Sequence, residues 1–538
     1  MADENVHGVP ALPLFTAAHE HATRRPSSTA IVDVKLSKSF TYSELLTGAA
    51  RVRCLILEAL ECDGPDIQEQ RVAFLVPSGI EYVRIQWGIW VAGGIAVPLC
   101  VTHPFQELEY VIGDSQPSLI FIHNDFSQHK SGLVASFPSI KILEVPAHAE
   151  VTEVTAALLT NPISFTPAFE LSRRALIIYT SGTTSKPKGC VTTHENIYFQ
   201  ANSLVKAWEY SHSDHLLHVL PLHHVHGIIN GLTATLLAGG TVELHQKFDP
   251  SVIWKRWSDG DSTLFMAVPT VYSRLNSHFS EKIAGTDGKE KAVKGAKSLR
   301  LLISGSDALP VSVKQQFKDI TGQVILERYG MTEIGMALSC HYHDEDGLGR
   351  PDGTVGWPLD GVEVRLVDEN RDEISFSMDP GEIQIRGPNV FKEYWQRPEA
   401  SAKEFTEDGF FKTGDIAYRN PNGAFIIRGR KSVDIIKSGG YKISALEIER
   451  EILANVAGVK EVAVVGVQDL EWGERVAAVL VMEQGHENLE LKDFRNVLRK
   501  SLAPYKIPSL IKVVESIERN AMGKINKKEL VRNLWPNS

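Results

Sequence analysis

The sequence predicts an α/β protein with a large N-terminal domain of layered α/β sheets, a β-rich subdomain and a small C-terminal α+β domain. Apolar runs typical of strands alternate with helical patterns up to about residue 428, which indicates α/β layers whose ligands bind at the loops after the strands. Short alternating strands separated by Gly, Pro and Asn begin near residue 353 and indicate the β-rich subdomain. The segment of about 110 residues after Arg430 has the size of a small domain.

The α/β layers are predicted from strand and helix patterns that follow each other directly. The apolar run of residues 71–77 precedes a helical pattern over residues 80–94. The longest apolar stretch, residues 87–101, is too short to cross a bilayer and is interrupted by Pro98. It predicts a buried helix that runs into a strand, whereas the polar residues 281–297 predict a solvated surface excursion.

The last third of the chain contains two further groups of elements. Alternating strands in residues 353–370, 381–387 and 423–430 form the predicted β-rich subdomain. In the C-terminal segment a strand pair is followed by a helix (445–455) and two strands (459–467 and 475–482). A second helix (491–502) and a last strand (507–516) complete it. We place the boundary at Gly429–Asp434, which gives domains 1–429 and 430–538.

Composition and charge exclude several classes of protein. A net charge of −10 and a pI near 6.0 argue against nucleic acid as the main partner. The five cysteines are scattered and form no CxxC pair, which argues against a disulfide framework or a zinc site and favours a reducing compartment. The acidic start lacks the pattern of a signal or transit peptide, so we expect a cytoplasmic protein, or a mitochondrial one if a presequence is missing from this sequence. Nothing in the pattern indicates an oligomeric state.

A glycine-rich loop is the strongest local signal. The sequence YTSGTTSKPKG (residues 179–189) follows the apolar run ALIIY. Glycines let backbone amides approach phosphate oxygens, hydroxyls donate further hydrogen bonds, and a lysine offsets negative charge. The Walker A pattern GxxxxGK[ST] is absent, and a flexible turn is the alternative. The candidate phosphate-binding residues are Thr180, Ser181, Gly182, Thr183, Thr184 and Lys188.

Four further blocks follow this loop along the chain. They are SGSDALP (304–310), YGMTE (329–333), KTGD (412–415) and ERNAMGK (518–524). Each block alone is typical of an ordinary turn, a helix cap or a basic tail. Together, and in this order, the five blocks resemble the adenylate-forming superfamily of acyl-CoA synthetases, peptide-synthetase adenylation domains and luciferases. The sequence departs from the family pattern at Ser185, where glycine is usual, and at Glu518, where proline is common.

The resemblance implies roles for individual residues. It places Tyr329 against the adenine, Thr332 at the α-phosphate, Glu333 at Mg²⁺, Asp415 at the ribose hydroxyls, and Arg430 at the ribose or phosphate. It adds Gly305, Ser306 and Gly330 to the ATP site, and it makes Lys188 and Lys524 catalytic cations. An aromatic face suits a base and a carboxylate suits a hard cation, so these roles agree with the chemistry of the side chains.

The same resemblance implies a two-step reaction with coenzyme A. The acid attacks the α-phosphate of ATP, and the thiol of CoA then displaces AMP from the acyl-adenylate. In the family the small domain is mobile and rotates between the two steps, exchanging Lys524 for a loop at the thiol tunnel. Here that loop is expected to contain Lys437, Gly439 and Gly440, with the hinge within residues 431–434.

Two segments bear on the acid that is activated. LPLHHVHG (220–227) places His224 and His226 at the expected acyl pocket, and no convincing further ligands support a metal there. Pro269 and Thr270 open a predicted helix that carries Arg274 about one turn in. A buried arginine requires an anion and pairs well with a carboxylate, which favours a small dicarboxylic acid. The alternative is a surface arginine that pairs with a nearby acid.

Whole stretches are most similar to malonyl-CoA synthetases, among them HVLPLHHVHGIING and FMAVPTVYSRL. This resemblance implies malonate as the substrate, with methylmalonate as a second candidate. Medium-chain or other small acids remain alternatives. A carrier-protein adenylation domain, a luciferase-type oxygenase and a non-catalytic nucleotide-binding protein are the rival classes.

Overall fold

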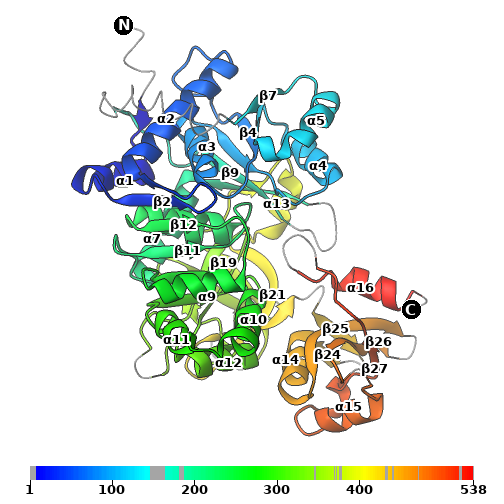
Figure 1. Cartoon of the computed structure of the whole chain (residues 1–538). Coiled ribbons are helices and arrows are strands. Elements are labelled where there is room, and N and C mark those ends of the chain that lie inside the picture. Colours follow the sequence, from blue (N-terminus) through cyan, green and yellow to red (C-terminus); the bar gives the residue numbers. More distant parts are fainter. Residues whose placement is uncertain are drawn as a thin grey trace.

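The computed structural model describes most of the chain. The described residues are 8–145, 164–180, 187–344, 347–368, 370, 372–374, 379–430, 434–438, 441–469, 472–486, 488–519 and 524–536. Figure 1 shows two large sheets with their helices, a curved β-rich region and a smaller C-terminal part coloured orange to red. No helix of the described residues is long and apolar enough to span a bilayer.

A seven-stranded sheet forms the first layer, in the order β20-β10-β9-β5-β4-β6-β7. Its central strands are parallel, whereas β10 and β20 are antiparallel to their neighbours. The strands are β4 (Arg71–Leu75), β5 (Ile95–Pro98), β6 (Leu119–Ile122), β7 (Lys141–Glu144), β9 (Arg174–Tyr179), β10 (Gly189–Thr193) and β20 (Glu393–Tyr394).

A nine-stranded sheet forms the second layer, in the order β17-β16-β15-β14-β13-β11-β12-β2-β3. Six neighbouring strands of this sheet, in the order β15-β14-β13-β11-β12-β2, pair in parallel. The loops that follow them therefore lie at one edge of the sheet. The strands are β2 (Thr29–Asp33), β3 (Lys38–Thr41), β11 (His215–His218), β12 (Thr241–Leu244), β13 (Leu264–Ala267), β14 (Leu301–Ser304), β15 (Leu326–Met331), β16 (Gly335–Ser339) and β17 (Trp357–Pro358).

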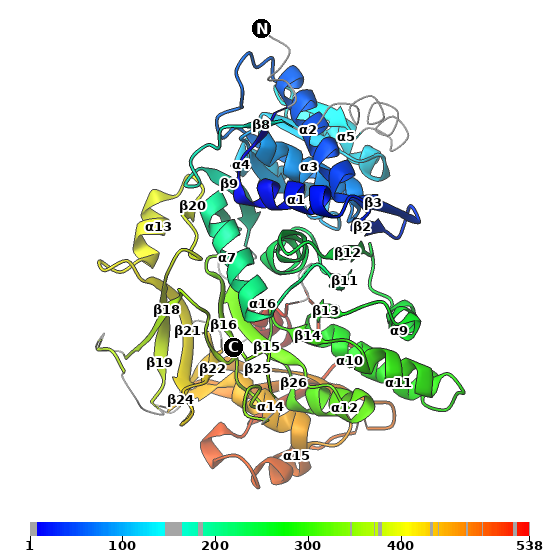
Figure 2. The same ribbon diagram turned by 90° about the vertical axis from the view of Figure 1, so that its left-hand side faces the viewer.

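Helices cover both faces of the two sheets (Figures 1 and 2). The main core joins both sheets through α1 (Pro13–Arg24), α2 (Tyr42–Ala59), α3 (Ile80–Val91), α7 (His194–Ala207) and α8 (Ala234–Leu237). The other face of the seven-stranded sheet carries α4 (Phe105–Ser115) and α5 (Lys130–Ser136). The other face of the nine-stranded sheet carries α9 (Pro250–Asp259), α10 (Pro269–His278), α11 (Lys289–Lys297) and α12 (Val311–Thr321). Shorter elements are β1 (Val9–Pro10), β8 (Phe165–Thr166), η1 (Asn124–His129), η2 (His226–Thr233), η3 (Phe279–Ile283) and η4 (Pro504–Lys506).

Local sequence explains why α2 and α3 occupy the middle of this stack. Thr41 and Glu44 form a capping box that starts α2. Helix α3 is buried along its whole length, with Trp87 0% and Trp90 1% exposed, because it is apolar nearly all round. The predicted buried helix that runs into a strand is therefore confirmed as α3 followed by β5.

The prediction of a solvated surface excursion at residues 281–297 is confirmed for the exposed residues 285–291 but is wrong for the buried side of the helix that follows. Helix α11 occupies the second half of this segment and packs against α9. Ala292 and Ala296 are buried, and a Cβ at Gly295 would lie 2.1 Å from the carbonyl oxygen of Trp257. Small residues at helical spacing form a narrow buried stripe here, and the surrounding lysines hide it in the sequence.

The β-rich region and the C-terminal part complete the fold, whose predicted class is confirmed. A four-stranded antiparallel sheet contains β18 (Glu363–Val367), β19 (Gly381–Arg386), β21 (Phe411–Arg419) and β22 (Phe425–Arg430), with α13 (Pro398–Glu404) nearby. The C-terminal sheet contains β23 (Ile435–Ser438), β24 (Tyr441–Ser444), β25 (Val459–Asp469), β26 (Gly473–Met482) and β27 (Leu510–Val513). Helices α14 (Ala445–Asn455) and α15 (Leu491–Leu498) cover one face, and α16 (Lys527–Leu534) covers the other. Helix α14 also contacts α12 and β22.

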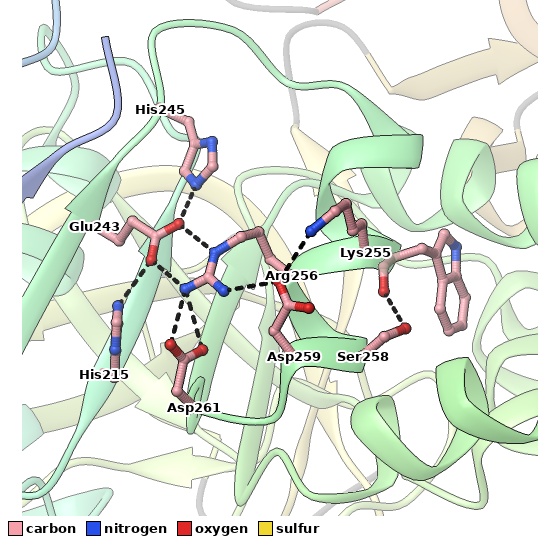
Figure 3. Close-up of polar contacts among 9 residues, drawn as sticks. His215, Glu243, His245, Lys255, Arg256, Ser258, Asp259 and Asp261 are labelled. Carbon is pink, nitrogen blue, oxygen red and sulfur yellow. Dashed lines mark hydrogen bonds and ion pairs between the residues drawn. The ribbon is translucent and has the colours of Figure 1, made fainter. Parts of the chain in front are cut away.

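A polar network fixes α9 to the nine-stranded sheet (Figure 3). Glu243 of β12 is 3% exposed and accepts hydrogen bonds from Arg256 Nε at 2.8 Å and Nη2 at 2.6 Å. The rings of His215 and His245 lie 3.0 and 2.9 Å from its oxygens. Burial opposes ionisation, but the bonds from Arg256 and the two histidines hold the pKa of Glu243 well below its usual range. The network is structural, since every polar partner in it is satisfied within the fold.

Candidate active site

A large cavity of ≈ 2350 Å³ brings nine of the predicted site residues together. It exceeds the roughly 300–1000 Å³ of a typical small-molecule pocket, so several substrates fit in it at once. Ser304 and Pro269, at or just after the carboxyl ends of β14 and β13, line it, as expected for a parallel sheet. The predicted residues that line it are Thr180, His224, Arg274, Ser306, Tyr329, Gly330, Asp415, Arg430 and Lys524.

Tyr329, Asp415 and Arg430 form a hydrogen-bonded group in the cavity wall. The Tyr329 hydroxyl donates to Asp415 Oδ2 at 2.6 Å, and Arg430 Nε donates to Asp415 Oδ1 at 3.0 Å. Asp415 of β21 lies opposite Arg430 of β22 in the strand register, so the sheet itself fixes this pair. The charge of Asp415 raises the pKa of Arg430 above its ordinary value. The group offers an aromatic ring, a carboxylate and a cation, which are complementary to a base, a ribose and a phosphate.

Glu333 and Lys188 both contact Tyr394, next to the residues that line the cavity. The Tyr394 hydroxyl donates to Glu333 Oε1 at 2.8 Å, and Lys188 Nζ lies 3.9 Å from the centre of the Tyr394 ring. Burial raises the pKa of Glu333, and the bond from Tyr394 opposes this change. Thr332 is half-buried, and its carbonyl oxygen accepts the Cys190 thiol at 3.5 Å.

Magnesium fits this donor set only together with a phosphate ligand. No cluster of three or more His, Cys, Asp or Glu side chains able to hold a metal occurs within the described ranges. Glu333 supplies a single carboxylate, and Mg²⁺ is usually held by one or two carboxylates plus substrate phosphates and water. Glu333 is therefore the residue that would hold Mg²⁺ when a nucleotide triphosphate is bound.

The glycine-rich loop joins two antiparallel strands, β9 and β10, and does not lead from a strand into a helix. At its base, the Thr180 amide and hydroxyl donate to the Lys188 carbonyl at 3.0 and 3.3 Å. The candidate residues Ser181, Gly182, Thr183 and Thr184 lie outside the described residues.

Gly305, Ser306 and Gly330 occupy positions with tight backbone requirements. Ser306 has φ = 71°, which is strained for a residue with a side chain. Its hydroxyl lies 3.3 Å from His226 Nδ1. A Cβ at Gly305 would lie 2.3 Å from Arg328 Cζ, and one at Gly330 would lie 2.0 Å from a backbone carbonyl oxygen. Both glycines are thus required by close packing.

The predicted acyl-pocket histidines are uncharged. Burial lowers the pKa of His226 well below its ordinary value. Burial, His223 and the charge of Lys524 lower the pKa of His224 in the same direction. Lys524 and His224 line the same cavity.

The expectation that Arg274 is buried is wrong. Arg274 is exposed at the cavity, and its guanidinium carbon lies 5.0 Å from the centre of the Phe248 ring. Helix α10 instead buries Tyr272 and Leu275 against the core, so its Arg274 face points away from the core.

The two predicted C-terminal contacts are placed differently. Lys524 lines the cavity, whereas Lys437 lies on β23, is exposed, and donates its backbone amide to Glu474 Oε2 at 2.6 Å. Gly439, Gly440 and the hinge candidates 431–433 are outside the described residues. Asp434 is described, and its Oδ2 accepts the Arg430 amide at 3.0 Å.

Three residues near the site were not predicted. Tyr394 is separated from Glu333 by 61 positions, so only the fold brings them together. Lys527 resembles part of a basic tail, yet it is 11% exposed and pairs with Asp434 at 2.7 Å. Arg328 is 3% exposed at the cavity, and the one available signal was a charged residue at the end of the apolar run VILER.

Comparison with known proteins identifies the family. The AMP-binding enzyme profile matches residues 18–395, and the profile of the AMP-binding enzyme C-terminal domain matches residues 447–524. The chain belongs to the AMP-binding enzyme family. The predicted resemblance to adenylate-forming enzymes is therefore confirmed.

Relatives of this AMP-binding enzyme are similar to it over nearly the full length. A human mitochondrial malonate–CoA ligase is 41% identical, with 97% of this chain and 92% of the relative covered. The crystal structure of ATP-bound MatB from Rhodopseudomonas palustris is 32% identical and superimposes with a TM-score of 0.83, covering 97% of this chain and 99% of that one. A malonyl-CoA ligase solved with methylmalonyl-CoA and AMP is 33% identical, with a TM-score of 0.65 and coverage of 94% and 100%.

Proposed function

We propose that this AMP-binding enzyme is an ATP-dependent malonate–CoA ligase that works through an acyl-adenylate. The observation that carries the proposal is that Lys524 shares one cavity with Tyr329, Asp415 and Arg430. A nucleotide-binding wall and a mobile cation at the acyl end are what the first step requires. The full-length similarity to malonate–CoA ligases supports the same reaction and substrate.

In the first step, a carboxylate oxygen bonds to the α-phosphorus of ATP while the bond to pyrophosphate breaks. Two anions must approach each other, so positioning and charge neutralisation dominate catalysis. Tyr329 holds the adenine, Asp415 accepts the ribose hydroxyls, and Arg430 and Lys188 offset phosphate charge. Lys524 lies between the carboxylate and the α-phosphate, with Thr332 and residues 180–184 donating to the phosphates. Glu333 would hold Mg²⁺, which would supply further positive charge to the phosphates when bound.

In the second step, the CoA sulfur bonds to the acyl carbon, AMP leaves with the electron pair of the broken bond, and the thiol proton passes to solvent. We propose that domain 430–538 rotates against domain 1–429 about a hinge within residues 431–434. This motion would withdraw Lys524 and bring Lys437, Gly439 and Gly440 to the cavity. The present arrangement, with Lys524 at the cavity and Lys437 away from it, suits the first step.

Malonate is the proposed acid, and methylmalonate is the second candidate. Arg274 adds positive charge to the cavity mouth and has no acidic partner among the described residues, so it attracts an acid with a second carboxylate. His224 and His226 are neutral and shape the acyl end of the cavity. Because they carry no charge, they do not repel the cations that bind a dianionic acid. Other small acids and medium-chain acids are the alternatives to be tested.

The proposal is tested by CoA-dependent AMP release across malonate, methylmalonate, acetate, propionate and octanoate. We expect malonate to give the highest kcat/KM. The Arg274→Ala enzyme should lose about tenfold in kcat/KM for malonate at low salt, with little change for propionate, because an exposed charge acts mainly on association. Arg24→Ala, at an exposed ion pair on α1, is the control.

Each other outcome changes one part of the proposal. An octanoate optimum would refute malonate and keep the ligase. AMP release that needs a carrier protein, or light emission with an aryl acid, would support a rival enzyme class. Absence of AMP release with every acid would support a non-catalytic nucleotide-binding protein.

We propose a mitochondrial site of action, as the name of the human relative states for that protein. All five cysteines are free, which suits a reducing compartment. Imaging of the full-length gene product fused to a fluorescent protein at its C-terminus tests this, and a diffuse cytoplasmic signal would refute it.

A further inference from the structure

A cysteine and two histidines form a cluster in the cavity wall. Cys100 follows β5, is 4% exposed and lines the cavity. His103 and His223 line the same cavity, and their ring centres lie 6.3 Å apart. The ring centre of His223 lies 4.1 Å from that of His224, a residue of the predicted acyl pocket. The cluster therefore places a nucleophile and two proton-carrying groups beside that pocket.

The chain itself holds Cys100 beside His103. The His103 amide donates to the Cys100 carbonyl at 3.2 Å, which closes a turn between β5 and α4. Cys100 Sγ lies 3.2 Å from the Thr102 hydroxyl within the same turn. Nε2 of His103 lies 3.2 Å from Oε2 of Glu107, which belongs to the first turn of α4. The thiol and the imidazole are thus positioned by local structure on both sides.

The electrostatics of the cluster favour a thiolate beside an imidazolium. Burial opposes ionisation of the Cys100 thiol, but the imidazoles of His103 and His223 lower its pKa to about 5. Burial also disfavours the charged ring of His103, whereas Cys100 and Glu107 raise the pKa of His103 above its ordinary value. The titratable groups around the sulfur are these two histidines, with Glu107 and His224 behind them.

The other four cysteines lack this combination of charge and access. Burial raises the pKa of Cys54, Cys190 and Cys340. All five cysteines are described by the structure, and of these Cys100 alone lines the cavity, so Cys62 also lies outside it. A reactive cysteine needs both a thiolate and a path for its reaction partner. Cys100 is the cysteine that has both.

Two ring nitrogens of the cluster are available to a small polar molecule. Both rings lie beside the sulfur, yet Nδ1 of His103 and Nε2 of His223 are buried and have no hydrogen-bond partner among the described residues. An unpaired buried polar atom is costly, so a ligand that pairs with it is favoured. Hydrogen peroxide has hydroxyl groups that pair with imidazole and an oxygen that a thiolate can attack. It is also small enough for a sulfur of which little is exposed.

We propose that Cys100 is a site of reversible oxidation by hydrogen peroxide and that its sulfenic acid inhibits the enzyme. The thiolate sulfur bonds to one peroxide oxygen, the O–O bond breaks, and the second oxygen leaves as hydroxide. The imidazolium of His103 gives this hydroxide a proton, so water is released and the sulfur has lost two electrons. A thiol reductant attacks the sulfenic sulfur and releases water, and a second thiol then cleaves the mixed disulfide and restores Cys100.

The inhibition rests on the proposed ligase activity, whereas the reactivity of Cys100 does not. Alkylation of the wild-type chain with iodoacetamide, followed by peptide mass spectrometry, measures that reactivity. Between about pH 6.5 and 8 the rate at Cys100 should be nearly constant, whereas the rate for N-acetylcysteine rises roughly tenfold per pH unit below its pKa. In His103→Asn the rate at Cys100 should rise with pH, because the imidazolium is lost. A wild-type rate that follows N-acetylcysteine would overturn the thiolate.

Peroxide treatment followed by CoA-dependent AMP release measures the inhibition. The wild-type rate should fall about tenfold or more and recover with dithiothreitol, and dimedone should label Cys100. Cys100→Ser should keep its own untreated rate. Cys62→Ser, which removes a cysteine outside the cavity, is the matched control and should be inhibited like wild type.

Equal inhibition of Cys100→Ser and wild type, or dimedone on other cysteines only, would overturn the proposed site. Poor folding of Cys100→Ser does not prevent the test, because both labelling experiments use the wild-type chain. Absence of AMP release before any treatment would instead overturn the proposed function, and dimedone labelling would still decide whether Cys100 is oxidised.

Discussion

At the scale of single residues, the site depends on contacts between side chains that the sequence separates widely. Tyr329 and Asp415 are 86 positions apart and meet at 2.6 Å. Asp415 receives two hydrogen bonds, one from this tyrosine and one from Arg430, and is 8% exposed. Its carboxylate is thus already oriented before a ribose arrives, which reduces the entropy lost on binding.

Asp415→Ala should therefore weaken nucleotide binding. Loss of the acceptor removes charge-assisted bonds to the ribose and leaves Arg430 without its partner, so the KM for ATP should rise roughly 10- to 100-fold. The KM for the acid should change much less. Initial rates at varied ATP give the measurement. Asp408→Ala, which removes an exposed partner of Arg365, is the control and should behave like wild type. An unchanged KM for ATP in Asp415→Ala would refute the ribose role.

At the scale of elements, α16 anchors the junction between the two parts of the chain. Lys527, its first residue, pairs with Asp434 at 2.7 Å and with Glu449 of α14 at 2.8 Å. Burial acts against the charged lysine, but the two carboxylates raise the pKa of Lys527 above its ordinary value. Lys524 lies three positions earlier, so the same pairing fixes the segment that carries it.

Lys527→Met should destabilise this arrangement. Two partly buried carboxylates would lose their shared cation, which costs up to about 3–5 kcal/mol. We expect a lower melting temperature and slower ATP–pyrophosphate exchange, because Lys524 is no longer held in place. Lys528→Met, at the exposed neighbouring lysine, should leave both measurements unchanged. Wild-type exchange and melting in Lys527→Met would show that the pairing has no such role.

At the scale of the whole molecule, burial of neutral histidines makes stability depend on pH. Burial lowers the pKa of His194 to about 3 and that of His218 to about 4. In the unfolded chain both titrate near 6.5, so below that pH the unfolded state binds more protons. Stability is therefore complete above about pH 6.5 and falls as the pH decreases toward 4.

Each of these histidines should reduce the free energy of unfolding by about 2 kcal/mol at pH 5. Melting temperatures measured between pH 7.5 and 5 test this. His194→Phe keeps a ring beside Trp90 and Phe169 and should show a smaller decrease with pH than wild type. Parallel pH curves for the two proteins would contradict the buried neutral state of His194.

Local patterns account for the parts of this molecule that could be predicted from its sequence. Strand and helix periodicities gave α3, β5 and the C-terminal elements, and short motifs gave Tyr329, Asp415, Arg430 and Lys524. Long-range contacts could not be predicted, as for Tyr394 with Glu333. The burial of a single charged side chain could not be predicted either. Arg274 and Arg328 both stand in mainly apolar segments, and only the packed fold shows that Arg274 is exposed and Arg328 is buried. Lys527 was hidden for the same reason.

The two cations Arg274 and Lys524 reach one cavity from different parts of the chain, and their proposed roles have a stereochemical consequence. Malonate can turn end for end between them and form the same product. Methylmalonate cannot, because turning it activates the opposite carboxylate and gives the mirror-image thioester. A cavity built from L-amino acids presents different walls to the methyl group in the two orientations. An achiral diacid would thus leave this enzyme predominantly as one enantiomer of its CoA ester.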